Sequence, residues 1–177
     1  MNSSLPTKEQ AIELLQRNHC STQVISHCQT VADIALEIAR RLNEKGVKID
    51  LQLVLVGALL HDIGRSKTNG VNHGVDGAGI AEKENLPEAV ATIIRKHVGG
   101  GFTAPEAIKL GWPSGDYMPS TLEEKVVSYA DKLADSSKGT KAPIEVEINR
   151  LKAAGHNEAA ERVYKMHQEI NGLLGDY

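Results

Sequence analysis

Aromatic residues are scarce in this 177-residue chain, which has one Trp, one Phe and 3% aromatic residues in total. A core must therefore be built from Leu, Ile, Val and Ala, which suits helix-on-helix packing better than a β-sandwich. Long apolar runs are also missing, because the longest, Leu51–Leu60, falls far short of the roughly 20 residues that cross a bilayer. No segment alternates polar and apolar residues for long, so the sequence predicts an all-α fold.

An excess of basic residues is absent, since the formal net charge is −3, and general nucleic-acid binding is not expected. A small anionic substrate stays compatible with this charge, because a metal ion supplies positive charge locally. Only two cysteines occur, Cys20 and Cys28, which is too few for the disulfide framework of a small secreted protein. The first residues, Met1–Thr7, are polar and lack the pattern of a signal peptide. These features predict a cytoplasmic protein with no membrane partner.

Apolar spacing and capping residues predict a series of helices. Thr7 with Gln10, and Thr121 with Glu124, match the capping-box pattern, and Asp50 precedes the most apolar segment as an N-cap. The predicted helices are Glu9–Asn18, Ser21 or Thr22 to Gly46, Leu51 to about Ile63, about Val75 to Glu84, Pro87 to about Val98, a short one from Pro105, Leu122 to about Ser136, and two within Pro143–Leu174 that are separated at Gly155. Arg65–Asn72 is predicted to be a loop, and Gly111–Ser120 a loop or lid with no assigned role.

Several histidines and aspartates lie where an apolar helix would bury them. His61 and Asp62 end the most apolar predicted helix, and burying an ionised Asp is costly unless it is paired or bound to a cation. His27 lies on the apolar face of the second helix, and Asp131 lies among Val126, Val127 and Ala130 on a later one. His73 and His97 stand near the ends of two intervening helices, whereas His19, His156 and His167 lie in polar or tail contexts and receive no role.

Imidazole and carboxylate ligands together suit first-row divalent metals such as Mn, Fe, Co, Ni or Zn. Neighbouring His61 and Asp62 can both face one ion, and a carboxylate can also bridge two ions. Taken singly, the other residues have simpler explanations: His27 as a hydrogen-bonded core residue, and Asp131 as the partner of an Arg or a helix cap. Together with His61-Asp62-Ile63-Gly64, however, they indicate a metal centre.

This arrangement resembles the HD-domain metal-dependent phosphohydrolases, specifically the subgroup with an HDIG signature. The resemblance covers residues of about 20–137, and the chain is expected to be one domain, 1–177, with this HD core and a C-terminal helical extension at about 143–174. The matching features, in order, are His27, His61-Asp62-Ile63-Gly64-Arg65, His73 with Gly77, His97, and Asp131 within Tyr129-Ala130-Asp131-Lys132-Leu133. Two features differ: Lys96-His97 stands where two-metal members often have His-His, and Gly99–Gly101 replaces the Gly-Tyr-Pro of the cyclic-dinucleotide branch. Cyclic di-GMP is therefore not favoured as the substrate.

The resemblance implies that two divalent ions are bound and that Asp62 bridges them. His27, His61 and Asp131 would bind one ion, and His73 and His97 the other. A metal-activated water would then attack phosphorus. Arg65 is a second expected catalytic residue, because its guanidinium can contact a phosphoryl oxygen; a solvated surface position is the alternative. Lys67, Lys96 and Lys132 are further candidates for substrate contact, although a Lys is more often a solvated surface residue.

The predicted function is hydrolysis of a nucleotide or another small phosphoester, either as a phosphomonoesterase or as a phosphodiesterase. Two alternatives remain: a metal-containing regulatory module that binds a ligand without turnover, and a di-iron oxygenase of the HD type. The complete ligand set argues against the regulatory module, and Arg65 favours phosphate over oxygen chemistry. The substrate, the metal and the oligomeric state are left open by the sequence.

Overall fold

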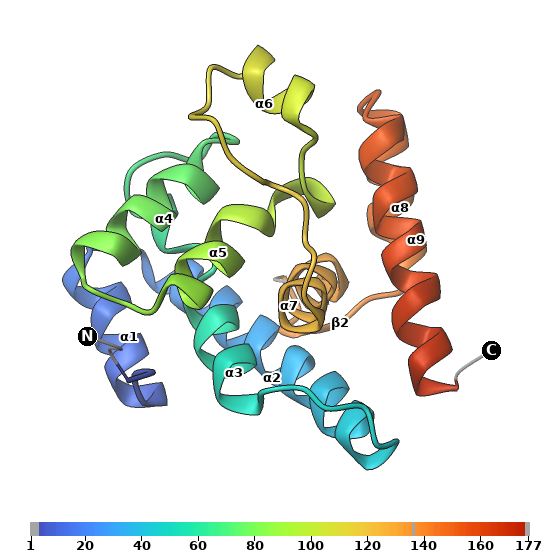
Figure 1. Ribbon diagram of the computed structural model, residues 1–177, viewed down its shortest axis with the longest axis horizontal. Coiled ribbons are helices and arrows are strands. Elements are labelled where there is room, and N and C mark those ends of the chain that lie inside the picture. Colours follow the sequence, from blue (N-terminus) through green and yellow to red (C-terminus); the bar gives the residue numbers. More distant parts are fainter. Residues whose placement is uncertain (1–3, 136, 176–177) are drawn as a thin grey trace.

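The computed structural model describes residues 4–135 and 137–175 and confirms the all-α fold (Figure 1). Within these residues the chain forms nine α-helices and two short 3₁₀ helices, η1 and η2. The α-helices are α1 (Lys8–Arg17), α2 (Thr22–Glu44), α3 (Leu51–Leu60), α4 (His73–Lys83), α5 (Glu88–Lys96), α6 (Ala104–Lys109), α7 (Leu122–Leu133), α8 (Ile144–Ala153) and α9 (Asn157–Leu174). The predicted capping boxes at Thr7 and Thr121 both form.

Helix α3 is the centre of the fold, and it contacts α1, α2, α5 and α7. Asp50 begins it as predicted: one carboxylate oxygen accepts the backbone N–H groups of Gln52 at 2.9 Å and Leu53 at 3.0 Å. Because α3 is apolar on every side, it can pack against several helices at once. Its C-terminal end lies inside the molecule, so the residues that follow Leu60 are buried as well.

The segment after α3 differs from the prediction. The helix ends at Leu60 rather than near Ile63, because Asp62 leaves the helical conformation with φ −100° and ψ 14°. Helix η1 (Ile63–Ser66) follows. Its second half, from Arg65, lies in the segment that was predicted to be a loop. Helix α4 then begins at His73, two residues before the predicted start. The early end of α3 leaves His61 and Asp62 buried just beyond the helix.

A small antiparallel hairpin follows α7, which ends at Leu133 rather than near Ser136, a residue outside the described ones. Strand β1 (Ala134–Asp135) pairs with β2 (Thr140–Lys141), with Ala134 opposite Lys141. Two-residue strands are too short to produce a recognisable alternation in the sequence, which explains why the hairpin was not predicted.

Helices α8 and α9 pack against each other and against α7, and α9 also contacts η2 (Val98–Gly100). Figure 1 shows them as a pair on the right of the molecule, beside α7. The predicted break at Gly155 is confirmed, since this residue has φ +80° between the two helices. The pair thereby forms a wall next to the helices that carry the predicted site.

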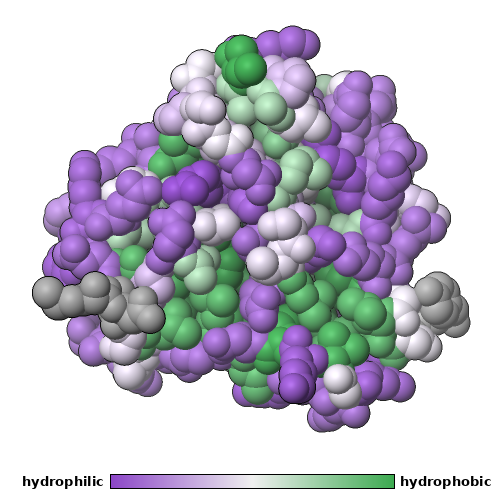
Figure 2. Space-filling view, in the orientation of Figure 1, coloured by the Kyte–Doolittle hydropathy of each residue, from purple (hydrophilic) through white to green (hydrophobic). Residues whose placement is uncertain are grey.

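The surface in Figure 2 is mostly hydrophilic around its rim, with hydrophobic residues gathered over α3 in the lower part of this face. Partly buried Leu51, Leu53 and Leu55 of α3 pack at the edge of the core. Within the described residues, no helix is both long enough and apolar enough to cross a membrane.

Candidate metal centre

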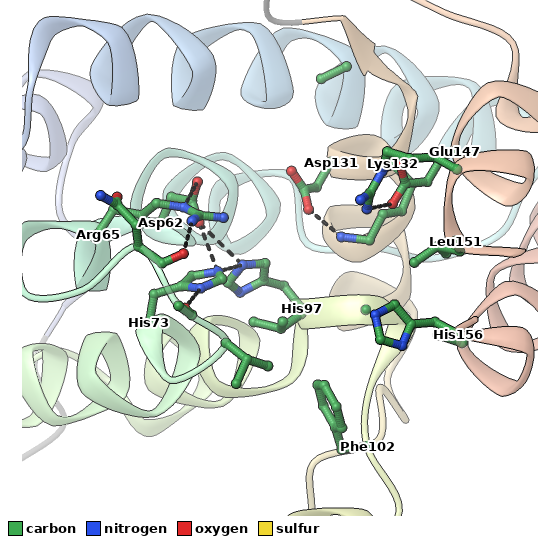
Figure 3. A pocket seen from close by; sticks show the side chains of 18 of the residues that line it. Asp62, Arg65, His73, His97, Phe102, Asp131, Lys132, Glu147, Leu151 and His156 are labelled. Carbon is green, nitrogen blue, oxygen red and sulfur yellow. Dashed lines mark hydrogen bonds and ion pairs between the residues drawn. The ribbon is translucent and has the colours of Figure 1, made fainter. Parts of the chain in front are cut away.

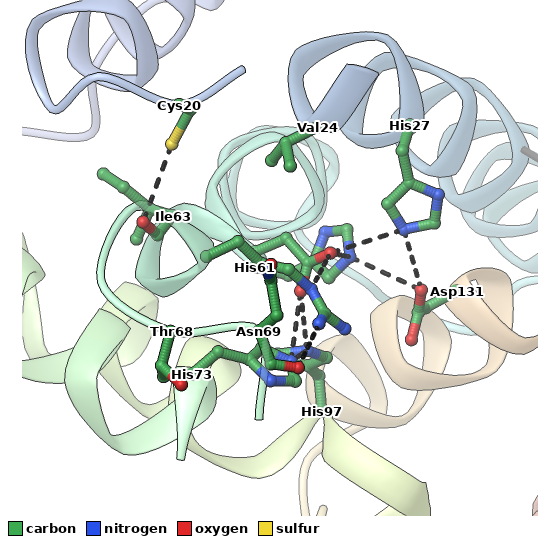
Figure 4. Close-up of polar contacts among 12 residues, drawn as sticks. Cys20, Val24, His27, His61, Ile63, Thr68, Asn69, His73, His97 and Asp131 are labelled. Carbon is green, nitrogen blue, oxygen red and sulfur yellow. Dashed lines mark hydrogen bonds and ion pairs between the residues drawn. The ribbon is translucent and has the colours of Figure 1, made fainter. Parts of the chain in front are cut away.

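The structure brings the six predicted ligands together from five parts of the chain; Figure 4 labels the four histidines and Asp131, and Figure 3 labels Asp62. Each lies on or at the end of a helix of the bundle. His27 lies on α2, His61 and Asp62 directly follow α3, His73 begins α4, His97 directly follows α5, and Asp131 lies on α7. Residues separated by as many as 104 positions therefore meet at one point, which only the packing of these helices allows.

The first group of ligands consists of His27, His61 and Asp131. Oδ1 of Asp131 lies 3.0 Å from Nε2 of His27 and 3.4 Å from Nε2 of His61. These three ligand atoms lie within 4.8 Å of one another, close enough to face one ion.

The second group consists of Asp62, His73 and His97. Oδ1 of Asp62 lies 3.1 Å from Nε2 of His73 and 3.4 Å from Nε2 of His97. Its other oxygen, Oδ2, faces the first group, at 3.7 Å from Nε2 of His27 and 3.8 Å from Nε2 of His61. Asp62 therefore lies between the two groups with one oxygen toward each, as a carboxylate that bridges two ions would.

Three of the imidazole rings are oriented by the same backbone contact. The Nδ1 of His61, His73 and His97 lies 2.7, 2.8 and 2.8 Å from the carbonyl oxygen three residues earlier in the chain. A carbonyl can only accept, so each Nδ1 donates a proton and, in a neutral ring, Nε2 is an acceptor. Such contacts hold metal-binding histidines in the correct tautomer.

The Nε2 acceptors of these rings face one another and the two carboxylates, which fits a site for cations. Nε2 of His73 lies 3.1 Å from Nε2 of His97, and two lone pairs at this distance repel unless a proton or an ion lies between them. Nε2 of His61 and Oδ1 of Asp62 are buried and have no hydrogen-bond partner of normal geometry within the described part of the chain. Unpartnered buried polar atoms are costly, and metal coordination removes that cost.

The pKa values of the ligand side chains are shifted by burial and by their neighbours. Burial alone raises the pKa of Asp62, but the imidazoles of His61, His73 and His97 outweigh it and hold that pKa well below its usual range. Burial also lowers the pKa of His97 to about 4, against the opposing effect of Asp62. An ionised Asp62 and a neutral His97 are forms that bind metals. Burial lowers the pKa of His61, but Asp62 and Asp131 outweigh it and raise that pKa, so metal binding there would displace a proton.

Two of the predicted substrate-binding cations lie at the centre. Arg65 donates from Nε to Oδ2 of Asp62 at 3.1 Å, and from Nη1 to the Asn69 carbonyl at 3.0 Å. The ammonium of Lys132 contacts Oδ2 of Asp131. Both side chains line the cavity next to the centre, so each can reach an anion bound there.

The other two cations are not brought to the cavity. Lys67 is exposed and does not line it. Lys96 precedes His97, but it does not line the cavity, and its buried ammonium contacts Asp116 at 2.8 Å and Glu124 at 3.2 Å. The structure therefore contradicts substrate contact by Lys96, whose charge instead holds the 111–120 loop against α5 and α7.

Replacement of Lys96 by Ala is expected to destabilise the fold by about 3 kcal/mol, because Glu124 would remain as a buried carboxylate without its cation. The value lies at the low end for a broken buried pair, since Glu124 still accepts hydrogen bonds from Ser120 and Thr121. Urea unfolding measures the effect. Lys165→Ala is the control, because Lys165 pairs with Glu161 at the surface and should change stability by under about 0.5 kcal/mol. Equal effects of the two substitutions would contradict this role for Lys96.

A cavity of about 890 Å³ extends from the centre toward α8 and α9 (Figure 3). Phe102 lines it and is held by Trp112, whose ring lies 4.8 Å away. The indole of Trp112 in turn donates to Oδ1 of Asn72 at 2.7 Å. This hydrogen bond connects the 111–120 segment, predicted as a loop or lid, to the start of α4. Lining residues on the far side include Arg150, His156 and Arg162. The sequence assigned no role to these three, because nothing in their spacing indicates which helix face meets the cavity.

Comparisons with known proteins agree with this arrangement. Residues 24–135 match the family described as HD domain, a range that includes all six predicted ligands. An uncharacterised protein of Methanocaldococcus jannaschii is 40% identical over 94% of this chain and 98% of its own length. Two tRNA (cytidine(56)-2′-O)-methyltransferases, from Thermoplasma volcanium and Picrophilus torridus, are 36% and 34% identical, but this chain spans only 48% of the length of each.

Solved structures with a similar fold include the HD domain of the phosphodiesterase PgpH from L. monocytogenes. That domain has a TM-score of 0.58 at 16% identity, over 93% of this chain and 95% of that one. Its complex with cyclic-di-AMP has a TM-score of 0.59 at 17% identity, over 95% and 97%. Identities this low relate the folds and not the activities. The family match and the full-length archaeal relative together show that the chain belongs to the HD domain family.

Proposed function

We propose that this chain is a metal-dependent phosphohydrolase that acts on a nucleotide or another small phosphoester. His27, His61 and Asp131 would hold one divalent ion, His73 and His97 a second, and Asp62 would be shared between them. The observation that carries the proposal is the convergence of imidazole and carboxylate acceptors at the centre, where Nε2 of His73 and Nε2 of His97 face each other at 3.1 Å. Imidazole and carboxylate ligands suit Mn, Fe, Co, Ni and Zn alike, so the ligands alone do not select the metal.

Divalent ions in such a site supply a water nucleophile at neutral pH and neutralise charge on phosphoryl oxygens. The protein contributes the orientation of the groups around them. Backbone carbonyls hold the rings of His61, His73 and His97, and Arg65 and Lys132 place positive charge beside the two ligand carboxylates. A phosphoryl group in the cavity would meet these cations, which favour an anion at that position.

A nucleotide is the substrate class that the cavity supports best. The volume of the cavity, about 890 Å³, suits a ligand much larger than inorganic phosphate. It combines cations near the centre with an aromatic side chain, Phe102, against which a base can stack. The PgpH domain of the same fold was solved with cyclic-di-AMP, which adds support for a nucleotide.

Removal of metal tests this proposal. The chain, purified without chelators, would be screened for phosphate release from nucleotides, sugar phosphates and dinucleotides, before and after treatment with EDTA. We expect hydrolysis of at least one substrate, a fall to background after EDTA, and recovery when a divalent ion is restored. Bound metal with no phosphate release from any substrate would favour the regulatory module, and substrate-dependent oxygen uptake would favour the oxygenase.

A further inference from the structure

The cavity has a second wall that lies outside the segment matched to the HD domain family. Family similarity ends at residue 135, whereas Arg150 of α8 and Arg162 of α9 line the side of the cavity that faces the metal centre. In Figure 3, Glu147, Leu151 and His156 occupy that side, opposite Asp62, His73 and His97. One phosphoryl group at the centre would therefore leave this wall without a ligand contact.

Arg162 carries donors that the fold does not use. Its side chain is only 16% exposed, and one terminal nitrogen, Nη2, donates to Oε1 of Glu106 at 3.1 Å. Its Nε is buried and has no hydrogen-bond partner among residues 4–135 and 137–175. A buried guanidinium donor without an acceptor is costly, and an anionic ligand oxygen would satisfy it.

Arg150 adds a second guanidinium on the same wall. Its Nε and Nη2 donate to the two carboxylate oxygens of Glu147 at 2.6 and 2.8 Å, so the guanidinium is held in place. Its Nη1 makes no hydrogen bond to residues 4–135 or 137–175 and can donate to a ligand. The charge of Asp131 helps to raise the pKa of Arg150, after the larger effect of its hydrogen bonds with Glu147. Arg150 also lines the same cavity as Asp131.

Three carboxylates line this wall, those of Glu106, Glu147 and the exposed Glu158, and the first two already have partners. Oε2 of Glu106 accepts the backbone N–H of Thr103 at 2.6 Å and its hydroxyl at 2.8 Å, while Oε1 accepts from Arg162. Both oxygens of Glu147 accept from Arg150. These two carboxylates orient the two guanidinium groups, and pre-oriented forks of this kind suit phosphate oxygens.

We propose that Arg162 and Arg150 form a second anion-binding subsite, which takes a phosphate group of the substrate remote from the one at the metal centre. The favoured ligand class is a nucleotide with two separate phosphate groups, with its base or sugar against Phe102 and Leu151. This inference rests on the proposed function for the identity of the first phosphate. Binding of the second phosphate at Arg162 and Arg150 does not depend on hydrolysis.

The test compares adenosine 5′-monophosphate with adenosine 3′,5′-bisphosphate, two probes that differ by one phosphate. Affinity for the full metal-loaded chain is measured by calorimetry, or as KM for a probe that is hydrolysed, and phosphate release is measured in the same samples. We expect the bisphosphate to bind at least about tenfold more tightly, the effect of one or two charge-assisted hydrogen bonds. Arg162→Gln should remove that advantage and leave the affinity for the monophosphate within about twofold.

Arg150→Gln is a second variant, and it should not affect folding because the Arg150 side chain is 65% exposed. It should lose part of the tighter binding of the bisphosphate over the monophosphate. Lys165→Gln, on α9 but not lining the cavity, is the matched control and should lose none. Equal affinity of the wild-type chain for both probes would overturn the subsite. An equal loss for both probes in Arg162→Gln would also overturn it, since a structural role through Glu106 would affect them alike.

The subsite and the proposed function can fail separately. If the advantage of the bisphosphate depends on Arg162 but no probe or screened substrate releases phosphate, the subsite stands and the hydrolase proposal fails. If phosphate is released but the second phosphate brings no advantage, the hydrolase stands and the subsite is wrong.

Discussion

Asp62→Asn is expected to lower phosphate release by roughly a thousandfold or more and to reduce the bound metal from about two ions per chain to one or none. The reason is geometric, because Asp62 directs one oxygen to His73 and His97 and the other to His27 and His61. Asn keeps the shape but lacks the charge and one of the two acceptor oxygens, so it cannot serve both groups. Steady-state assays and elemental analysis of the same preparation measure the two effects.

The matched control is Asp33→Asn, which makes the same substitution at an exposed position of α2. It should leave activity and metal content unchanged. Circular dichroism should show a helical fold for both variants, because Asn has nearly the same volume as Asp. Full activity of Asp62→Asn with unchanged metal would contradict the shared role of this carboxylate.

Gly64→Ala is expected to destabilise the chain by more than about 4 kcal/mol, or to prevent it from folding. A Cβ at this position would lie 1.9 Å from the carbonyl oxygen of His73 and 2.6 Å from the backbone nitrogen of Gly77. Both atoms belong to the backbone of α4, so no side chain can rotate away. Helix α4 would have to move, and it carries the ligand His73 with it. Urea unfolding measures the loss of stability.

Gly79→Ala, in α4, is the matched control. A Cβ there meets nothing within 4 Å, and Ala is the better helix former by about 0.8–1 kcal/mol, so this variant should be slightly more stable than the wild type. A stability of Gly64→Ala within about 1 kcal/mol of the wild type would show that η1 and α4 do not pack as described.

Much of the fold was predictable because local signals and tertiary packing agree. Asp50 caps α3, and Gly155 breaks α8 from α9 with a positive φ, as their positions in the sequence indicated. The burial of His61 and Asp62 was predictable for a related reason. His61 and Asp62 follow the most apolar helix, and polar groups buried there need a partner that the surrounding Leu and Val residues cannot supply.

Other features depend on long-range packing that no local pattern records. Lys96 and His97 are adjacent in the sequence, yet the end of α5 directs His97 into the centre and Lys96 toward Glu124. Arg150 and Arg162 meet the cavity only because α8 and α9 fold back beside α7. In the same way, nothing in the sequence showed that Trp112 would hold Phe102 at the edge of the cavity.

The most direct test of the metal centre is a crystal structure of the full chain grown with Mn²⁺, with anomalous diffraction data used to locate the ions. We expect two anomalous peaks, one among His27, His61 and Asp131 and the other beside His73 and His97, with Asp62 between them. A map without a peak among these six residues, from crystals in which the protein is folded as described, would contradict the account.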